Sequence, residues 1–451
     1  MKIQAFTILT SLLHLVNASF IPQEYAEYAE YAGYTKVENS LPATFMDGIF
    51  GDLVNTREIV SRKHEKLYSG ELLHPNEGIH ISSASLHAYY DAKKINFPDK
   101  DDVSDLISES NLFSGIVSFA HLPVHQCFTN QTEQIDIAIV GAPFDSGVSY
   151  TPGTRFGPNG IRQGSRRLMG GISPIRGNSK ESKLYRLPIY DTGLKMVDCG
   201  DVPMTPFDAR VALDELYRGQ HAIHKHDATE NSVNFAKTRI ITLGGDHTVT
   251  LMNLKSAYET FIDTDKDNDG LAIIHFDSHI DTWDPKVLGG GLTKYASLNH
   301  GTFLHYAAEA GYVSANHSVH VGIRAPFISA HDEVHDGECG FDIITSKDVD
   351  RLTPIGVGRK IKDIVGDRPV YLTFDLDTFD AGMINSGTLE AGGLNSREIM
   401  TILDELEGIK LVGCDIVEVS TPPNSVGNDI TGLLAAQVVD EMIGLMVVTE
   451  L

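Results

Sequence analysis

Cysteine is scarce in this chain, which has four among its 451 residues. So few cysteines exclude the disulfide-dense scaffolds that small secreted domains use in place of a large core. Cys199 and Cys414 lie in apolar runs and are predicted to be buried thiols, and Cys127 with Cys339 is a candidate bridge. The chain is instead long enough to hold one large α/β domain or two smaller ones around a hydrophobic core.

Positive charge is also scarce, because 36 lysines and arginines stand against 61 aspartates and glutamates, giving a formal net charge of -25. A protein that binds nucleic acid needs clustered lysines and arginines to neutralise phosphates. This balance therefore argues against a nucleic-acid partner. It fits a soluble protein that attracts a small cationic substrate.

Long apolar runs are missing except near the N-terminus, where residues 5–16 form one after Lys2. Small residues follow it, a pattern typical of a cleavable signal peptide, which we expect at residues 1–18. The run is too short for a transmembrane helix, and no later run approaches that length. The sequence predicts entry into the secretory pathway without a membrane span, and leaves open whether the protein is secreted, vacuolar or held at the cell wall.

Hydrophobic patterning separates an irregular N-terminal part from a regular core. Residues 24–34 repeat Tyr-Ala-Glu, and such low complexity is typical of a poorly ordered terminus, so residues 19–118 are interpreted as an N-terminal extension. In residues 119–451, apolar strand runs alternate with helical patterns, which predicts an α/β fold with a mostly parallel, buried sheet. The strand runs are residues 135–140, 194–197, 238–243, 271–276, 318–323, 341–345, 370–374 and 411–419, and the helical patterns include 207–224, 249–262, 396–406 and 430–446.

Three short polar segments, at residues 244–247, 277–281 and 375–377, each close an apolar strand run. Side chains at i, i+2 and i+4 of a strand share one face, and parallel strands end at one edge of a sheet, so we expect the segments to converge. Carboxylates with imidazoles favour Mn²⁺ over Zn²⁺, and so many ligands suit two ions. Two ions that share a water lower its pKa, which predicts a hydrolase. The candidate ligands are His247, Asp277, His279, Asp281, Asp375 and Asp377.

The same three segments resemble the metal-binding motifs of the ureohydrolase superfamily, which includes arginase and agmatinase. The resemblance extends to three further segments, residues 152–162, 299–302 and 415–419. It covers the chain from about Phe119 to the C-terminus, the predicted catalytic domain, and residues 119–123 are similar to those of fungal agmatinase-like members. Membership implies a three-layer α/β/α sandwich with a mostly parallel sheet, two Mn²⁺ ions per subunit and a homo-oligomer, commonly a trimer or hexamer.

The resemblance also implies roles for individual residues. The metal ions would be surrounded by His247, Asp277, Asp281 and Asp375, with His279 and Asp377 completing the pair of sites. His300 matches the histidine that delivers a proton to the leaving amine, chemistry that suits an imidazole. Glu418 matches the carboxylate that binds the planar guanidinium, and Asp281 would help to stabilise the tetrahedral intermediate. The implied reaction is hydrolysis of agmatine to urea and putrescine by attack of a metal-bridging hydroxide.

One segment departs from the family pattern. Residues 381–390 lack the prolines that usually follow Asp380 in agmatinase-like chains, and the segment is one residue shorter. Because this loop follows the metal ligands directly, the substrate is left open. The alternative substrates are 4-guanidinobutyrate, arginine or another guanidino compound. A further alternative is that the protein is a non-catalytic secreted metal-binding homologue.

Three weaker signals have no place in this scheme. His221, His224 and His226 could bind a metal near a helix end, but we expect them to be exposed. Residues 265–270 begin like a calcium loop but lack its final glutamate, so they are interpreted as an acidic loop. Arg324 lies at a position that the family places near the site, with no role assigned.

Overall fold

The computed structural model describes residues 114–129, 132–168, 170–263, 269–288 and 296–450. The chain divides into two compact units, Met1–Glu109 and Ser110–Leu451, and only the second contains described residues. The predicted signal peptide, the Tyr-Ala-Glu repeat and nearly all of the predicted extension lie outside the described residues, as does most of the acidic loop at 265–270.

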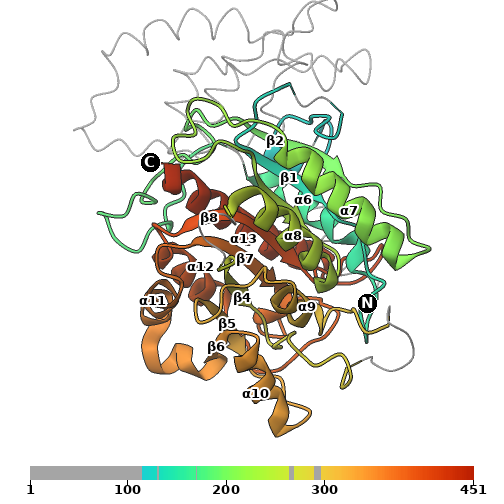
Figure 1. The fold of residues 1–451 in the computed structure, drawn as a ribbon. Helices are drawn as coiled ribbons and strands as arrows, with labels where there is room; N and C mark the ends of the chain where they lie inside the picture. The colour runs from blue at the N-terminus through green and yellow to red at the C-terminus, as the bar shows by residue number, and fades with distance from the viewer. Residues whose placement is uncertain (1–113, 130–131, 169, 264–268, 289–295, 451) are drawn as a thin grey trace, which may run out of the picture. The chain divides into compact units, whose positions relative to one another are not determined.

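The centre of the second unit is an eight-stranded sheet in which every pair of neighbours is parallel (Figure 1). Its order is β2-β1-β3-β8-β7-β4-β5-β6. Each of the eight predicted strand runs corresponds to one of these strands. The strands are β1 (Ile137–Gly141), β2 (Met196–Asp201), β3 (Arg239–Leu243), β4 (Ala272–Phe276), β5 (Ser318–Ile323), β6 (Phe341–Thr345), β7 (Pro369–Asp375) and β8 (Lys410–Val417).

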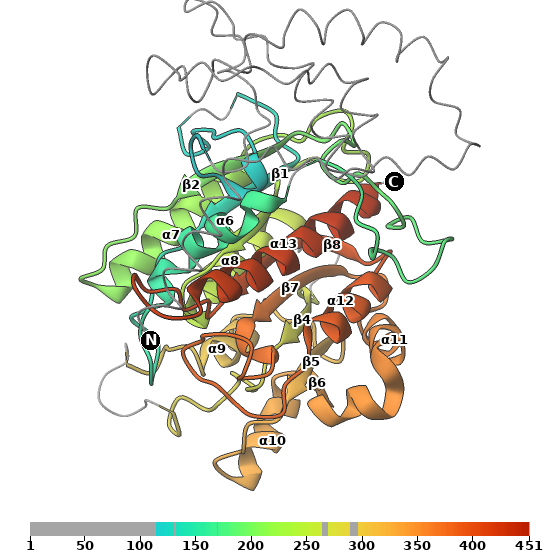
Figure 2. The same cartoon turned by 180° about the vertical axis from the view of Figure 1, so that it is seen from behind.

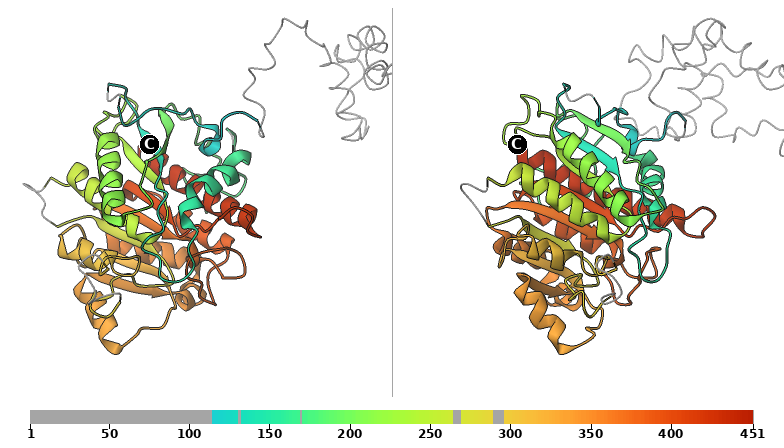
Figure 3. Two further views of the ribbon diagram at one scale, coloured as in Figure 1. Left: turned by 90° about the vertical axis from the view of Figure 1, so that its right-hand side faces the viewer. Right: turned by 45° about the vertical axis from the view of Figure 1, so that its right-hand side comes forward.

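Helices cover both faces of the sheet, as expected for an α/β/α sandwich. On one face lie α6 (Gly157–Gly164), α11 (Ser346–Val365), α12 (Ser396–Glu405) and α13 (Asn428–Glu450) (Figure 2). On the other lie α7 (Ala209–His224), α8 (Thr250–Phe261) and α9 (Phe303–Glu309), and α10 (Ala330–Glu338) packs by β6. The left view of Figure 3 shows strands between the two helical layers.

Alternation along the strands divides the core between the two layers. In β1, Ile137 and Ile139 pack with the residues of α12 and α13, whereas Ala138 and Val140 pack with those of α7. Both sets are fully buried, as a parallel sheet covered on both sides requires. The apolar runs were therefore a sufficient signal for the strands.

Four helices correspond to the predicted helical patterns, and four others have no such pattern. Of the helices in the described residues, α7, α8, α12 and α13 were named among the predicted patterns, whereas α6, α9, α10 and α11 were not. In α11 the helical pattern is broken at Thr353, which has φ 66°, and at Pro354. Helix α6 has three glycines and a proline in eight residues, a composition of low helix propensity. Tertiary packing, rather than a pattern in the sequence, therefore determines that these four segments are helical.

Helix α13 corrects one expectation about membranes. Over Asn428–Thr449 it has a mean hydropathy of 1.6, so by length and composition it could span a membrane, contrary to the expectation that no later run approaches that length. Its apolar stretch is 78% buried inside the domain, against α6, α12 and β8. It is the only helix of this kind within the described ranges, and its burial is that of a core helix.

The disulfide joins Cys127 to Cys199, so the predicted Cys127–Cys339 bridge is wrong, as is the prediction that Cys199 is a free thiol. The segment before β1 runs beside β2, where the backbone N–H of His125 donates to the carbonyl of Asp198 at 2.9 Å. This pairing brings Cys127 against β2. Cys339 and Cys414 are free and buried.

Candidate metal centre and active site

The site is built on four adjacent strands in the middle of the sheet, in the order β3-β8-β7-β4. His247 follows β3, Glu418 follows β8, Asp375 is the last residue of β7, and Asp277 follows β4. Because all four strands are parallel, their carboxyl ends lie at one edge, where parallel sheets bind ligands. The sheet therefore brings together side chains that lie up to 171 residues apart.

A first cluster of ligand atoms surrounds His247. Its Nδ1 atom lies 3.1 Å from Oδ2 of Asp277, 3.2 Å from Oδ2 of Asp281 and 3.3 Å from Oδ2 of Asp375. The other ring nitrogen, Nε2, is 2.8 Å from the hydroxyl of Thr373, which sets the orientation of the ring. All of these side chains are buried.

A second cluster surrounds His279 and shares one residue with the first. Nδ1 of His279 lies 3.2 Å from Oδ1 of Asp277 and 3.0 Å from Oδ2 of Asp377. Asp277 thus turns one carboxylate oxygen to each cluster. All six predicted ligands are brought together, in two groups joined by a bridging carboxylate.

The reason for this convergence differs from the prediction. We expected strand alternation to align residues 277–281, but β4 ends at Phe276, and Asp281 has a left-handed backbone with φ 53°. Asp377 likewise lies in a 3₁₀ turn, Leu376–Thr378, after β7. The turns are held by the carboxylates themselves, because the backbone N–H groups of Ser278 and Asp377 donate to Asp377 and Asp375 at 3.0 and 2.7 Å.

The raised pKa values and the unpaired buried atoms of the two clusters indicate that they bind a cation. Burial, and then the charge of Asp277, raise the pKa of Asp281 to about 6, and burial with the neighbouring charges raises the pKa of Asp375. Burial opposes protonation of His279, yet Asp377 and Asp277 raise its pKa to about 12. Nδ1 of His247, Oδ2 of Asp277 and Oδ2 of Asp377 are buried without a hydrogen-bond partner. Divalent metal ions would satisfy these atoms and neutralise the carboxylates, so the residues fit a metal centre.

His300 and Glu418 lie side by side next to the first cluster. Nδ1 of His300 is 3.5 Å from Oε1 of Glu418, which also accepts a 3.0 Å hydrogen bond from the backbone N–H of His247. Burial opposes protonation of His300, but Glu418 and then Asp281 raise its pKa to about 9. Oε2 of Glu418 is buried without a partner. This pair combines an imidazolium with a carboxylate oxygen that is available to a ligand.

Several residues of the site were missed by sequence reasoning. Nε2 of His275 lies 3.0 Å from Oδ2 of Asp277, and its Nδ1 is 2.6 Å from Nδ1 of His320, which contacts Asp336 at 2.9 Å. This buried chain of side chains orients the bridging Asp277. His275 could have been found, because it stands two residues before Asp277. No sequence signal links His320 or Asp336 to the site.

Arg324 holds the altered loop against the metal centre. The Nη2 group of Arg324 donates to the carbonyls of Asp377 at 2.5 Å and of Glu390 at 3.0 Å. The arginine therefore attaches the loop of residues 381–390 to the second cluster. Oε1 of Glu390, in the same loop, lies 3.8 Å from Nε2 of His279, and the side chain of Glu390 is 37% exposed.

The three histidines near the end of α7 do not gather around one point. His224 is buried against the hydroxyl of Ser256 at 2.8 Å, and both ring nitrogens of His226 contact backbone carbonyls. The prediction that they are exposed is wrong for these two residues. Their burial follows from tertiary packing, because α7 packs His224 against Ser256 of α8 and the turn after α7 packs His226 against the carbonyls of Cys127 and Glu133.

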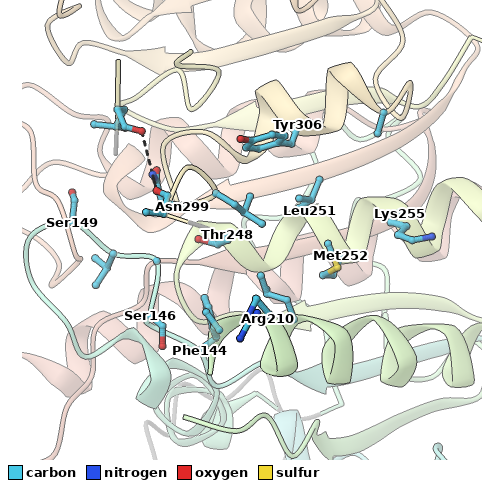
Figure 4. Close-up of a pocket in the computed structure, with 18 of the residues that line it drawn as sticks. Phe144, Ser146, Ser149, Arg210, Thr248, Leu251, Met252, Lys255, Asn299 and Tyr306 are labelled. Carbon is cyan, nitrogen blue, oxygen red and sulfur yellow. Dashed lines mark hydrogen bonds between the residues drawn. The ribbon is translucent and has the colours of Figure 1, made fainter. Parts of the chain in front are cut away.

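An apolar cavity of about 580 Å³ lies beside the site, between α7, α8 and the region of α9 (Figure 4). Leu251, Met252 and Tyr306 line it, and it meets the site at Ser149, whose hydroxyl is 2.8 Å from Nε2 of His300. No candidate metal ligand lines this cavity. The cavity and the metal centre are therefore neighbouring features that share the loop containing Ser149.

Comparison with known proteins gives consistent matches to one family. The model of the Arginase family matches residues 135–444. Putative agmatinase 1 of Schizosaccharomyces pombe is 40% identical over 350 residues, covering 75% of this chain and 84% of that protein. Agmatinase of Proteus mirabilis is 32% identical over 341 residues, covering 75% and 95%. Among solved structures, the proclavaminate amidino hydrolase of Streptomyces clavuligerus has a TM-score of 0.62 and 30% identity, covering 75% of this chain and 100% of that one.

Proposed function

The chain belongs to the arginase family, and on this premise we propose that it hydrolyses the guanidino group of agmatine to urea and putrescine with two Mn²⁺ ions. One observation carries the proposal. Two clusters of buried ligand atoms share Asp277, and beside them lies Glu418 with an unpartnered carboxylate oxygen. A centre made only for metal storage would not need that oxygen.

The metal ions would be held by His247, Asp277, Asp281 and Asp375 on one side and by His279, Asp277 and Asp377 on the other. Bound there, they would supply Lewis-acid charge and an acidified water molecule. Mn²⁺ is favoured because the set is rich in hard carboxylate oxygens and contains no thiolate. The hydrogen bond between Thr373 and His247 and the 3.0 Å contact of His275 with Asp277 would fix the ligands before the substrate binds.

The side chains next to the metals would bind and protonate the substrate. Glu418 would accept charge-assisted hydrogen bonds from the planar guanidinium through its free Oε2. His300 would hold a proton at neutral pH, because Glu418 raises its pKa to about 9, and would donate it to the departing amine. Asp281, at the edge of the first cluster, would stabilise charge at the reacting carbon.

Agmatine is favoured over 4-guanidinobutyrate because the two arginines near the site, Arg155 and Arg324, already have partners. A substrate carboxylate needs a cation, but Arg155 is paired with Asp145, and Arg324 donates to backbone carbonyls. Glu390, 37% exposed beside His279, offers instead a carboxylate to a cationic tail. The similarity to an amidino hydrolase that is named for another substrate makes a parallel assay of several guanidino compounds necessary.

The test is urea release by the Mn²⁺-loaded protein from agmatine, arginine and 4-guanidinobutyrate in parallel. We expect agmatine to be preferred, and Asp375→Ala to abolish turnover, whereas the matched exposed change Asp350→Ala in α11 leaves it intact. Unchanged turnover in Asp375→Ala would overturn the metal assignment. A preference for another compound would move the proposal to that substrate, and no urea from any of them would favour a non-catalytic binding protein.

Assembly and location complete the proposal. A homo-oligomer, as a trimer or hexamer, would give a light-scattering mass of three or six times the 49.3 kDa chain, less any cleaved signal peptide. The Cys127–Cys199 disulfide supports passage through the secretory pathway, because disulfides persist in oxidising compartments.

A further inference from the structure

A second group of metal-binding side chains lies away from the carboxylate clusters, between α9 and α10. Nδ1 of His305 is 3.0 Å from Nε2 of His335, which is 3.8 Å from Sγ of Cys339. All three ligand atoms lie within 4.8 Å of one another. His335 and Cys339 are four residues apart at the end of α10, so they share one face of the helix, which turns toward His305 of α9.

These distances suit one small ion. Around a tetrahedral zinc, nitrogen atoms lie about 3.3 Å apart, and nitrogen and sulfur about 3.6 Å apart, from bond lengths of roughly 2.0–2.1 and 2.3 Å. The spacings of 3.0 and 3.8 Å therefore need shifts of only a few tenths of an ångström. The third pair, His305 with Cys339, lies within 4.8 Å and would close by at most about 1 Å on binding an ion. Cys339 is 8% exposed and the side chain of His335 is 15% exposed, so an ion could reach the group from solvent.

The chemistry of this group differs from that of the central clusters. Two imidazoles and a thiolate select borderline-soft ions, whereas the centre offers mainly carboxylates. Burial, and then the neighbouring His335, lower the pKa of His305, which keeps its imidazole neutral and able to coordinate. Burial, and then the charges of Asp336 and Glu338, raise the pKa of Cys339 to about 12, so a metal must displace a proton there.

The same two helices hold the loop that carries Asp281. On α10, Asp336 accepts a hydrogen bond from the hydroxyl of Thr282 at 2.5 Å, and Asp332 accepts one from the indole of Trp283 at 3.3 Å. On the α9 side, the backbone N–H of Leu304 donates to the carbonyl of Asp281 at 3.2 Å. An ion that joined α9 to α10 would therefore stabilise this loop from both sides.

We propose that His305, His335 and Cys339 bind one zinc-class ion, which clamps α10 to α9 and supports the loop of the metal centre. Water would complete the coordination, because three protein ligands leave one tetrahedral position open. The role that we assign to this ion is to hold the two helices together, and it is distinct from the ions of the carboxylate clusters.

The test uses Co²⁺ as an optical probe on the full-length protein already loaded with Mn²⁺. We expect one equivalent of Co²⁺ to give a sulfur-to-cobalt charge-transfer band, which the carboxylate clusters cannot produce because they contain no cysteine. Cys339→Ser should lose the band, and the matched change Cys414→Ala, at the other free thiol, should keep it. No band in the parent, or a band that persists in Cys339→Ser, would overturn the proposal.

His305→Gln provides a second test that leaves every thiol in place. Its affinity for Zn²⁺ should fall by at least about 100-fold, the upper end of the loss caused by removing even an outer partner of a ligand. Added Zn²⁺ should raise the melting temperature of the parent but not of this variant. Equal Zn²⁺ affinity in both proteins would mean that the two histidines form only a hydrogen-bonded contact.

Discussion

Two residues of the site adopt a left-handed backbone conformation that residues other than glycine rarely take. Asp281 has φ 53° and Glu418 has φ 57°. Such conformations cost of order 1–3 kcal/mol each and persist where the surroundings over-determine them. Here the constraint is visible, because the backbone N–H of Glu418 donates to the carbonyl of Gly245 at 2.9 Å. The strain turns the Glu418 side chain back toward His247 and His300.

Replacing Glu418 tests its function at the scale of one residue. Glu418→Gln keeps an oxygen for the N–H of His247 but removes the charge, so kcat/KM for the guanidino substrate should fall about 10- to 100-fold, the ~1.5–3 kcal/mol typical of a hydrogen bond to a charged group. The alkaline limb of the pH–rate profile should move to lower pH, because Glu418 raises the pKa of His300. The control is the manganese content of the variant, which should equal that of the parent. An unchanged profile would contradict the role of Glu418.

At the scale of elements, α6 and α13 touch through glycine. A Cβ atom at Gly164 would lie 2.1 Å from the carbonyl oxygen of Gly432, and one at Gly432 would lie 2.4 Å from that of Gly160. No side chain fits between backbones at that separation. The close approach seats the end of α6 on the core helix α13.

Matched glycine substitutions test this crossing. Gly164→Ala should lower the unfolding free energy by about 1–3 kcal/mol, because the methyl group meets backbone that cannot yield. Gly337→Ala, in an open position of α10, should raise it by about 0.5–1 kcal/mol by removing unfolded-chain entropy. Urea denaturation measures both changes. An unchanged or higher unfolding free energy in Gly164→Ala would show that the crossing is not tightly packed.

The packing of α7 on α8 makes stability depend on pH through His224. Burial, and then the charge of His221, lower the pKa of His224 from 6.5 to about 3, so the native protein keeps it neutral while the unfolded chain takes up a proton below pH 6.5. Stability is therefore lost as the pH falls, by about 2 kcal/mol from this residue between pH 7 and pH 5. Between pH 7 and pH 5, the unfolding free energy of His224→Asn, measured by urea denaturation, should fall by about 2 kcal/mol less than that of the parent. His331→Asn, at an exposed histidine of α10, should behave like the parent.

At the scale of the whole molecule, the disulfide ties the segment before β1 to an edge of the sheet. Cys127 and Cys199 close a loop with a sequence separation of 72 residues. In the chain-entropy description, such a loop stabilises the native state by about 4 kcal/mol. The domain thus combines a large buried core with one covalent staple.

The double change Cys127→Ala with Cys199→Ala should lower the unfolding free energy by about 4 kcal/mol without changing the metal content. The same two changes should remove the difference between the melting temperatures of the oxidised and the reduced protein. Cys414→Ala, at a free cysteine outside every proposed metal site, is the control that leaves the bridge intact. Recovery of a 127–199 disulfide peptide from the native source would support the secretory route, and its absence there would contradict it.

The sequence by itself determined the strands and the six candidate metal ligands that the structure brings together. Continuous apolar runs are a local signal, and polar residues at strand ends mark the edge at which parallel strands bind ligands. That is why the eight apolar runs match eight strands, and why the positions of His247, Asp277 and Asp375 in the sequence suffice to place them at one edge.

Only the tertiary structure decided which groups meet across the chain. It set the oxygens of Asp277 that serve each cluster, the pairing of Cys127 with Cys199, the burial of His224, and the meeting of His305 with His335 and Cys339. These contacts join segments far apart in sequence, and they depend on turn conformations such as that of Asp281. Local periodicity contains no information about such distances, because they follow from how the layers pack on the sheet.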